Sequence, residues 1–155
     1  MNESGMGGTN WVTKNSLIKW NRAGAVWPNH TLFGSRGVDQ NDVKQGQIGD
    51  CWFMAAANTL AKVPSRVENL FLNVENRMSP NGIYGLNMYL LGVPRTIIID
   101  DFLPLQSGST AGSFRTLFAG IGADNSLWVP LLEKAFAKLY GNYAHISGGD
   151  PKLAV

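Results

Sequence analysis

The residues with the clearest capacity for chemistry surround the single cysteine of this sequence, Cys51. The run that contains it, residues 45–52, reads Gln-Gly-Gln-Ile-Gly-Asp-Cys-Trp. Gln45 thus lies a short loop before the thiol. A thiol at the start of a helix, with an amide donor held nearby by a tight loop, is suited to acyl transfer. The thiol would attack a carbonyl carbon while N–H groups stabilise the oxyanion.

The predicted chemistry of Cys51 depends on where the thiol lies. A cysteine attacks as its thiolate, and an unperturbed thiol, with a pKa of about 8.5, is only slightly ionised at neutral pH. The first turn of a helix favours negative charge. Gly46 and Gly49 let the preceding loop pass close to the thiol, so that Gln45 donates its amide beside the Cys51 backbone N–H. The alternative is a small buried hydrophobe, as most free cysteines are.

Several predicted helices and strands would position the run at residues 45–52. Asp50 is a good N-cap, and residues 51–62 are apolar almost all round, which predicts a helix buried on most sides and ended by Pro64. Residues 65–71 predict a short second helix. Residues 83–91 and 95–100 predict an antiparallel hairpin that reverses at residues 92–94.

A further helix is predicted over residues 128–140. Its apolar residues form one stripe, so we expect Glu133, Lys134 and Lys138 to point away from the core, and Gly141 to end the helix.

The other segments carry weaker patterns. Residues 1–15 predict a flexible tail. Residues 16–38 predict a segment with little regular structure, attached by aromatic anchors, and residues 101–122 predict a loop.

Composition narrows the class of protein. The chain has 155 residues, 45% of them hydrophobic, so it can bury a core, and its net charge of +2 gives no support for nucleic-acid binding. One cysteine excludes an internal disulfide and a cysteine-based metal site. It fits a reducing, intracellular setting, and we expect the cytoplasm. No run of about 18 apolar residues predicts a transmembrane helix, and the N-terminus does not have the pattern of a secretory signal.

The run at residues 45–52 resembles the active-site signature of the calpain family of calcium-dependent cysteine proteases. Further blocks match in order. Residues 20–22 resemble the family's W-x-R, and residues 97–104 resemble its V-V-I-D-D-x-L-P. Residues 127–143 resemble F-W-x-x-L-L-E-K-A-Y-A-K-L-Y-G-x-Y, and residues 146–149 resemble L-S-G-G. The resemblance covers roughly residues 16–150.

The resemblance implies an α+β fold of the papain-like cysteine protease superfamily. Residues 16–155 would form the first subdomain of the protease core, a mainly helical lobe with a small antiparallel hairpin or sheet. Cys51 matches the nucleophile, Gln45 the oxyanion-hole glutamine, and Trp52 the tryptophan that helps shape the site together with Gly49. The implied substrates are proteins and peptides.

The base that this mechanism needs is a histidine oriented by an asparagine. In papain these lie roughly 130–150 residues after the cysteine, beyond the end of this chain. We expect His30 to be a solvated loop histidine and His145 not to act as a base. The expectation is therefore a fragment whose partner is the second protease subdomain, inactive alone.

The resemblance also implies a calcium ion in each subdomain. By position, Ser35 and Gly37 would supply carbonyl oxygens and Asp42 a carboxylate, the oxygen donors that calcium prefers. The family's second carboxylate is replaced here by Ser126, and Asp124 is close enough in sequence to substitute. The alternative for Asp42 is a solvated loop acid.

Asp100 and Asp101 suggest a metal or acid–base pair, but adjacent strand residues point to opposite faces, which favours a loop-capping role.

Two functions from different classes remain open. The first is an endopeptidase lobe in which Cys51 attacks a peptide carbonyl. The second is a non-catalytic calpain-like scaffold or regulatory module. An unrelated thiol transferase is disfavoured by the further matching blocks.

Overall fold

The computed structural model of the chain describes residues 18–73, 78–108, 110, 112–150 and 152. The tail predicted over residues 1–15 lies outside these residues. The elements in chain order are β1 (Ile18–Arg22), α2 (Ala23–Val26), η1 (Gln40–Asp42), α3 (Cys51–Ala61), α4 (Pro64–Glu68), β2 (Ile83–Leu90), β3 (Val93–Asp100), β4 (Phe102–Ser107), β5 (Phe114–Thr116), α5 (Trp128–Leu139) and η2 (Tyr143–Ile146).

Helices and antiparallel strands occupy separate parts of the chain, which confirms the coarse prediction of an α+β fold. One sheet has the strand order β1-β4-β5, and β2 and β3 form a second, two-stranded sheet. Strands and α-helices contribute comparable numbers of described residues, so the lobe contains more sheet than expected. No helix among the described residues is both long and apolar enough to cross a membrane.

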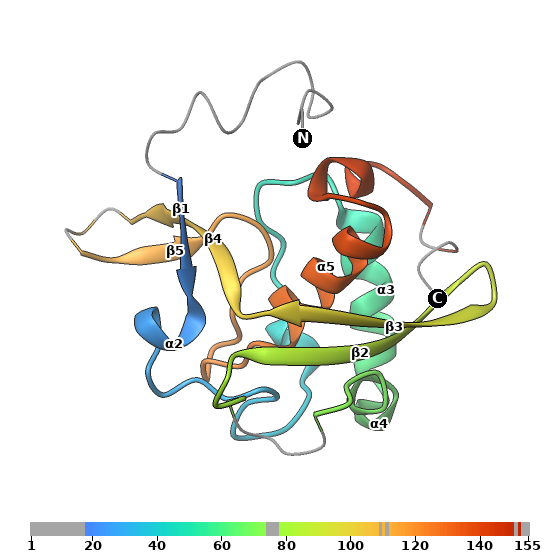
Figure 1. The fold of residues 1–155 in the computed structure, drawn as a ribbon, viewed down its shortest axis with the longest axis horizontal. Coiled ribbons are helices and arrows are strands. Elements are labelled where there is room, and N and C mark those ends of the chain that lie inside the picture. Colours follow the sequence, from blue (N-terminus) through green and yellow to red (C-terminus); the bar gives the residue numbers. More distant parts are fainter. Residues whose placement is uncertain (1–17, 74–77, 109, 111, 151, 153–155) are drawn as a thin grey trace.

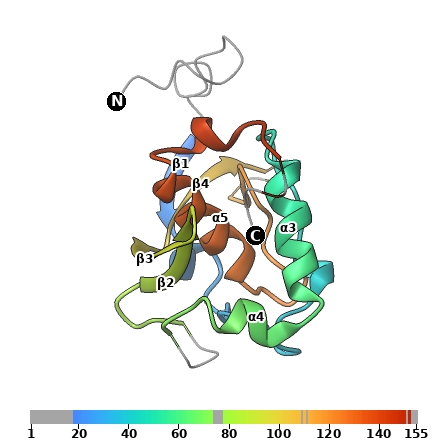
Figure 2. The ribbon, with the colours of Figure 1, turned by 90° about the vertical axis from the view of Figure 1, so that its right-hand side faces the viewer.

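Helix α5 is the central element. In Figure 2 it lies between the β2–β3 hairpin on one side and α3 on the other. Phe136 of α5 stacks on Phe53 of α3, with ring centroids 4.4 Å apart. Trp128 at the start of α5 is fully buried. Burial of these large apolar surfaces fixes α3 relative to α5, because area removed from water is the dominant favourable term in folding.

The strongly patterned segments form the predicted elements. Helix α3 begins at Cys51, and α4 begins at Pro64, where the missing N–H of proline has no consequence. The hairpin turns at Leu91 and Gly92, both with positive φ, so the chain reverses earlier than the predicted residues 92–94, and Val93 and Pro94 belong to β3. That backbone geometry is typical of two-residue hairpin turns.

Two predictions of irregular structure are wrong. Residues 16–38 include β1 and α2, and residues 101–122 include β4 and β5. β1 pairs antiparallel with β4 from Ile18 opposite Gln106 to Arg22 opposite Phe102. These short strands are stabilised by partners distant in sequence, which local patterns do not reveal.

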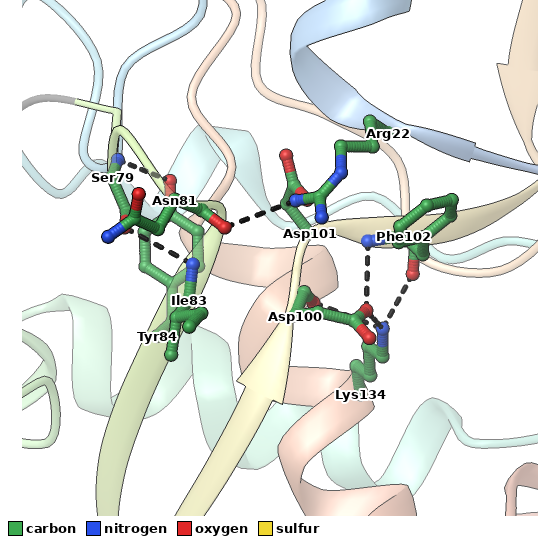
Figure 3. A network of polar contacts seen from close by, with 9 residues as sticks. All are labelled: Arg22, Ser79, Asn81, Ile83, Tyr84, Asp100, Asp101, Phe102 and Lys134. Carbon is green, nitrogen blue, oxygen red and sulfur yellow. Dashed lines mark hydrogen bonds and ion pairs between the residues drawn. The ribbon is translucent and has the colours of Figure 1, made fainter.

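Polar contacts join the two sheets to α5, as Figure 3 shows. Arg22 of β1 forms an ion pair with buried Asp101 at 2.7 Å. Lys134 of α5 binds the carboxylate of Asp100 and the carbonyl oxygen of Phe102. Asp100 also accepts the Phe102 N–H, so its predicted loop-capping role is confirmed. The prediction that Lys134 points away is wrong, whereas Lys138 is exposed as expected.

Candidate active site

Cys51 is the first residue of α3, and its side chain is exposed. The next two residues, Trp52 and Phe53, are buried and pack against Phe136 of α5. Aromatic packing therefore fixes the start of the helix while the thiol faces solvent. This exposure does not match the alternative of a small buried hydrophobe.

Gln45 lies in the loop that leads to Cys51, and its side chain is also exposed. Its Nε2 donates a hydrogen bond of 2.9 Å to the carbonyl oxygen of Ile48. The side chain therefore closes its own loop, and no described hydrogen bond joins it to Cys51. A carboxamide has two N–H donors, so one remains for a substrate.

The loop over residues 44–49 lies against residues 117–120, which we call the backing segment. Gln47 N–H donates to the Leu117 carbonyl oxygen at 3.0 Å, and Gly120 N–H donates to the Lys44 carbonyl oxygen at 2.8 Å. A Cβ atom on Gly46 would lie 1.9 Å from the Phe118 carbonyl oxygen. Only glycine fits this close approach of two backbones.

Gly49 is less constrained. A Cβ atom there would meet only the Ser147 hydroxyl, at 3.3 Å. Its carbonyl oxygen accepts the Gly148 N–H at 2.8 Å, which fastens the C-terminal segment beside the loop.

Trp52 contacts the same C-terminal segment, residues 146–149. Its Nε1 donates to the Ile146 carbonyl oxygen at 2.8 Å, and a Cβ atom on Gly149 would overlap its ring. In the described residues Trp52 is thus a buried anchor beneath the exposed thiol, which can shape the site only through the backbone it supports.

Sequence reasoning missed a buried carboxyl pair beneath Cys51. Asp50 occupies the N-cap position, yet its side chain makes no cap hydrogen bond, and it is completely buried. Glu133 is 1% exposed, so the prediction that it points away is wrong. Its helix α5 is buried along most of its length, including residues off the apolar stripe, so the stripe alone gave no signal that Glu133 lies inside.

The surroundings of this pair change the proton affinity of both groups. Burial raises the pKa of Asp50 above its ordinary value. Burial, together with the hydrogen bond and charge of Asp50, raises the pKa of Glu133 well above its ordinary value. Desolvation and a neighbouring negative charge both disfavour ionisation of a carboxyl group.

Neither histidine is placed as a base. His30 is buried, which contradicts the predicted solvated loop histidine, and its Nδ1 lies 2.6 Å from the Trp27 carbonyl oxygen. Backbone hydrogen bonds hold the loop after α2 in this position, from the His30 N–H to the Trp27 carbonyl oxygen at 3.1 Å and from the Thr31 N–H to the Asn125 carbonyl oxygen at 3.3 Å. His145 is exposed, and its Nδ1 lies 2.7 Å from the Tyr140 carbonyl oxygen. Both rings are thus hydrogen-bonded within their own segments.

The residues with a possible calcium role gather around the loop before Ser126. Asp42 is buried rather than solvated, and its Oδ2 accepts hydrogen bonds from Ser126 Oγ at 2.8 Å and Trp128 Nε1 at 3.3 Å. Asp124 accepts both the backbone N–H and the hydroxyl of Ser35. Gly37 lies in the same loop as Ser35 and has a φ of 76°.

These oxygen donors are of the type that a hard cation prefers, but the described residues supply only part of a coordination shell. The Oδ1 atoms of Asp42 and Asp124 are buried and have no hydrogen-bond partner. Burial raises the pKa of Asp124, but the hydrogen bonds from Ser35 outweigh it, so the net pKa is below its ordinary value. No group of three or more His, Cys, Asp or Glu side chains in the described part of the chain is arranged to hold a metal.

Comparison with known proteins assigns the chain to a family. The model of the calpain family cysteine proteases matches residues 2–155. The chain is 34% identical over 141 residues to Calpain-5 of Caenorhabditis elegans, covering 88% of this chain and 21% of that protein. It is 34% identical over 139 residues to the calpain-type cysteine protease DEK1 of Arabidopsis thaliana, covering 90% of this chain and 6% of that protein.

A third relative is similar in extent. The Calpain of Schistosoma mansoni is 31% identical over 140 residues, covering 89% of this chain and 18% of that protein. The chain thus spans about a fifth or less of the length of these relatives. From the family match and these identities, the chain belongs to the calpain family of cysteine proteases.

Proposed function

We propose that residues 16–155 form the nucleophile-bearing lobe of a calcium-dependent cysteine endopeptidase. A second subdomain would supply the histidine and asparagine. The observation that carries this proposal is the exposed thiol of Cys51 at the start of α3, at the end of the loop that also bears Gln45. Proteins and peptides are the proposed substrates.

The chemistry follows from these positions. The Cys51 thiolate attacks the peptide carbonyl carbon, a C–S bond forms, and the carbonyl electron pair moves to oxygen. The Cys51 backbone N–H and the remaining Gln45 amide N–H stabilise the oxyanion. The tetrahedral intermediate expels the amine, which takes its proton from the histidine of the second subdomain. Water then hydrolyses the thioester and restores the thiol.

The test uses the protein that carries this lobe together with its histidine-bearing lobe. We expect Cys51→Ser to lower kcat/KM for an unfolded protein substrate by about 10³-fold or more, because the nucleophile acts as a unit with its base. Asn58→Ser, at an exposed position of the same helix, is the control and should cleave normally. Proteolysis retained by Cys51→Ser would contradict the proposal and favour the scaffold or regulatory module.

The calcium part of the proposal assigns one carboxylate oxygen of Asp42 and the carbonyl oxygens of Ser35 and Gly37 as ligands. Its support is the unpartnered, buried Oδ1 of Asp42. Bound calcium would supply positive charge that fixes this loop. The site needs further oxygen donors, and Asp124 is the nearest carboxylate along the facing loop.

Terbium luminescence tests this assignment directly. Because Trp128 Nε1 lies 3.3 Å from Asp42, excitation of its indole should sensitise a Tb³⁺ ion bound there. We expect calcium to compete with the signal, and Asp42→Asn to weaken binding roughly tenfold or more, since it removes ligand charge. Asp150→Asn, an exposed carboxylate elsewhere, should leave it unchanged. A signal unaffected by Asp42→Asn would refute the assignment.

A further inference from the structure

The buried carboxyl groups of Asp50 and Glu133 come from two elements that meet beneath the candidate active site. Asp50 is the N-cap residue of α3 and Glu133 lies within α5. Both side chains are buried, and each contributes to the pKa of the other, so the two carboxyl groups are neighbours. Ionised carboxylates are acceptors only. A hydrogen bond between two carboxyl groups therefore requires a proton on one of them.

The other contacts of the pair provide no donor to Asp50 from another described residue. Both carboxylate oxygens of Glu133 accept the Ala119 N–H, at 3.1 Å each. Both side-chain oxygens of Asp50 are buried, and no hydrogen bond from another described residue reaches them. Two buried negative charges in contact would be strongly unfavourable, whereas one charge with one shared proton satisfies both groups.

The pair also joins the parts that form the candidate active site. Ala119 belongs to the backing segment, whose neighbours Leu117 and Gly120 bind the loop over residues 44–49. Asp50 follows this loop directly and precedes Cys51. Glu133 thus connects the rigid helix α5 to both ends of the loop that carries Gln45, through Ala119 at one end and Asp50 at the other.

We propose that Asp50 and Glu133 share a single proton, and that this protonated pair is the positioning device that holds the loop of Gln45 and the thiol of Cys51 in place. The positioning role rests on the function proposed above, whereas the shared proton does not. Neither side chain needs to touch a substrate.

Loss of the shared proton should loosen the loop. Besides the adjacent Cys51, the ionisable group of the described residues that faces the pair is Tyr143 of η2. Burial and the negative charges of Glu133 and Asp50 raise the pKa of Tyr143 well above its ordinary value. Neither neighbour is a cation, and Lys134, next to Glu133 in sequence, binds Asp100 and the Phe102 carbonyl oxygen instead, so full ionisation of the pair has no compensating charge. The wild-type loop should therefore open as the pH rises.

Glu133→Gln is the decisive variant. The amide nitrogen of glutamine can donate to ionised Asp50, and its oxygen can accept the Ala119 N–H, but the group does not titrate. Glu68→Gln makes the same chemical change at an exposed glutamate of α4 and serves as the control.

Hydrogen exchange of the Gln47, Ala119 and Gly120 amides measures how often the loop over residues 44–49 opens away from the backing segment. In the wild-type chain and in Glu68→Gln, we expect the protection factors to fall at least about tenfold as the pH rises through the second ionisation of the pair. In Glu133→Gln they should stay constant. Glu133→Ala should lose protection at every pH. If Glu133→Gln keeps the protection that Glu133→Ala loses, the hydrogen bonds of the side chain at position 133 are what hold the loop. If the alanine variant does not fold, the glutamine comparison still decides.

Infrared spectroscopy detects the proton itself. At neutral pH the wild-type chain should show the carbonyl stretch of a buried protonated carboxyl group. Glu133→Gln should lose that band and Glu68→Gln should keep it. A wild-type spectrum without the band, or a Glu133→Gln chain whose protection follows the wild-type pH dependence, overturns the proposal. These readouts do not require proteolysis, so they are independent of the outcome for Cys51→Ser.

Discussion

At the scale of single residues, the role of Gln45 can be separated from that of its loop. Gln45→Ala removes the side-chain donor, and we expect kcat for a protein substrate to fall by about 10²–10³-fold with little change in KM. Gln47→Ala is the matched control, because Gln47 is an exposed glutamine of the same loop that binds Gln106 instead. Similar losses in both variants would show that the loop, rather than the Gln45 amide, accounts for the effect.

The sequence reveals some of these residues and not others. Cys51 and Gln45 are identifiable because their spacing and glycines lie within one short run. Glu133 and His30 are not, because burial of a polar side chain depends on partners that meet only in the folded chain. Glu133 needs Asp50 and Ala119 beside it before the interior becomes favourable.

At the scale of elements, Gly46 determines whether the active-site loop can lie against the backing segment. A methyl group there would collide with the Phe118 carbonyl oxygen. We expect Gly46→Ala to lower the free energy of unfolding by about 1–3 kcal/mol, measured by urea denaturation. Gly49→Ala meets only a serine hydroxyl and should lower it much less. Equal losses would show that this backbone approach is not what constrains the loop.

The elements predicted correctly share strong local patterns. Helix α3 is apolar and alanine-rich, and α5 has a regular apolar stripe. In the β2–β3 hairpin, an alternating strand and a β-branched strand flank a glycine turn. Strands β1, β4 and β5 are short, and Pro104 lies within β4. Their pairing is set by long-range contacts, so local sequence did not indicate it.

At the scale of the whole molecule, the buried carboxyl group of Glu133 and the ion-paired carboxyl group of Asp100 make the free energy of unfolding depend on pH in opposite directions. Burial raises the pKa of Asp100, but the hydrogen bonds and charge of Lys134 outweigh it, so its folded-state pKa is below the ordinary 3.8. Its stabilising contribution is present above 3.8 and is lost as the pH falls. The pKa of Glu133 is raised above the ordinary 4.5, so its contribution is present below 4.5 and is lost as the pH rises.

The contribution of Glu133 to the free energy of unfolding should therefore be fully present below pH 4.5 and decline as the pH rises above it. Urea denaturation across this range measures the decline, and Glu133→Gln should flatten it. Asp100→Asn should instead reduce the loss of stability below pH 3.8. Stability that rises steadily as the pH increases above 4.5, by the same amount in the wild type and in Glu133→Gln, would be incompatible with a raised Glu133 pKa.

The pairing of β1 with β4 constrains the order of assembly during synthesis. Arg22 and its partner Asp101 are 79 residues apart. β1 therefore leaves the ribosome long before the strand that completes its hydrogen bonds. Until then it presents an open strand edge, the kind of surface through which nascent chains associate wrongly. The first of the described strands to be made is thus among the last to find its place, and this lobe has most need of chaperones while it is being translated.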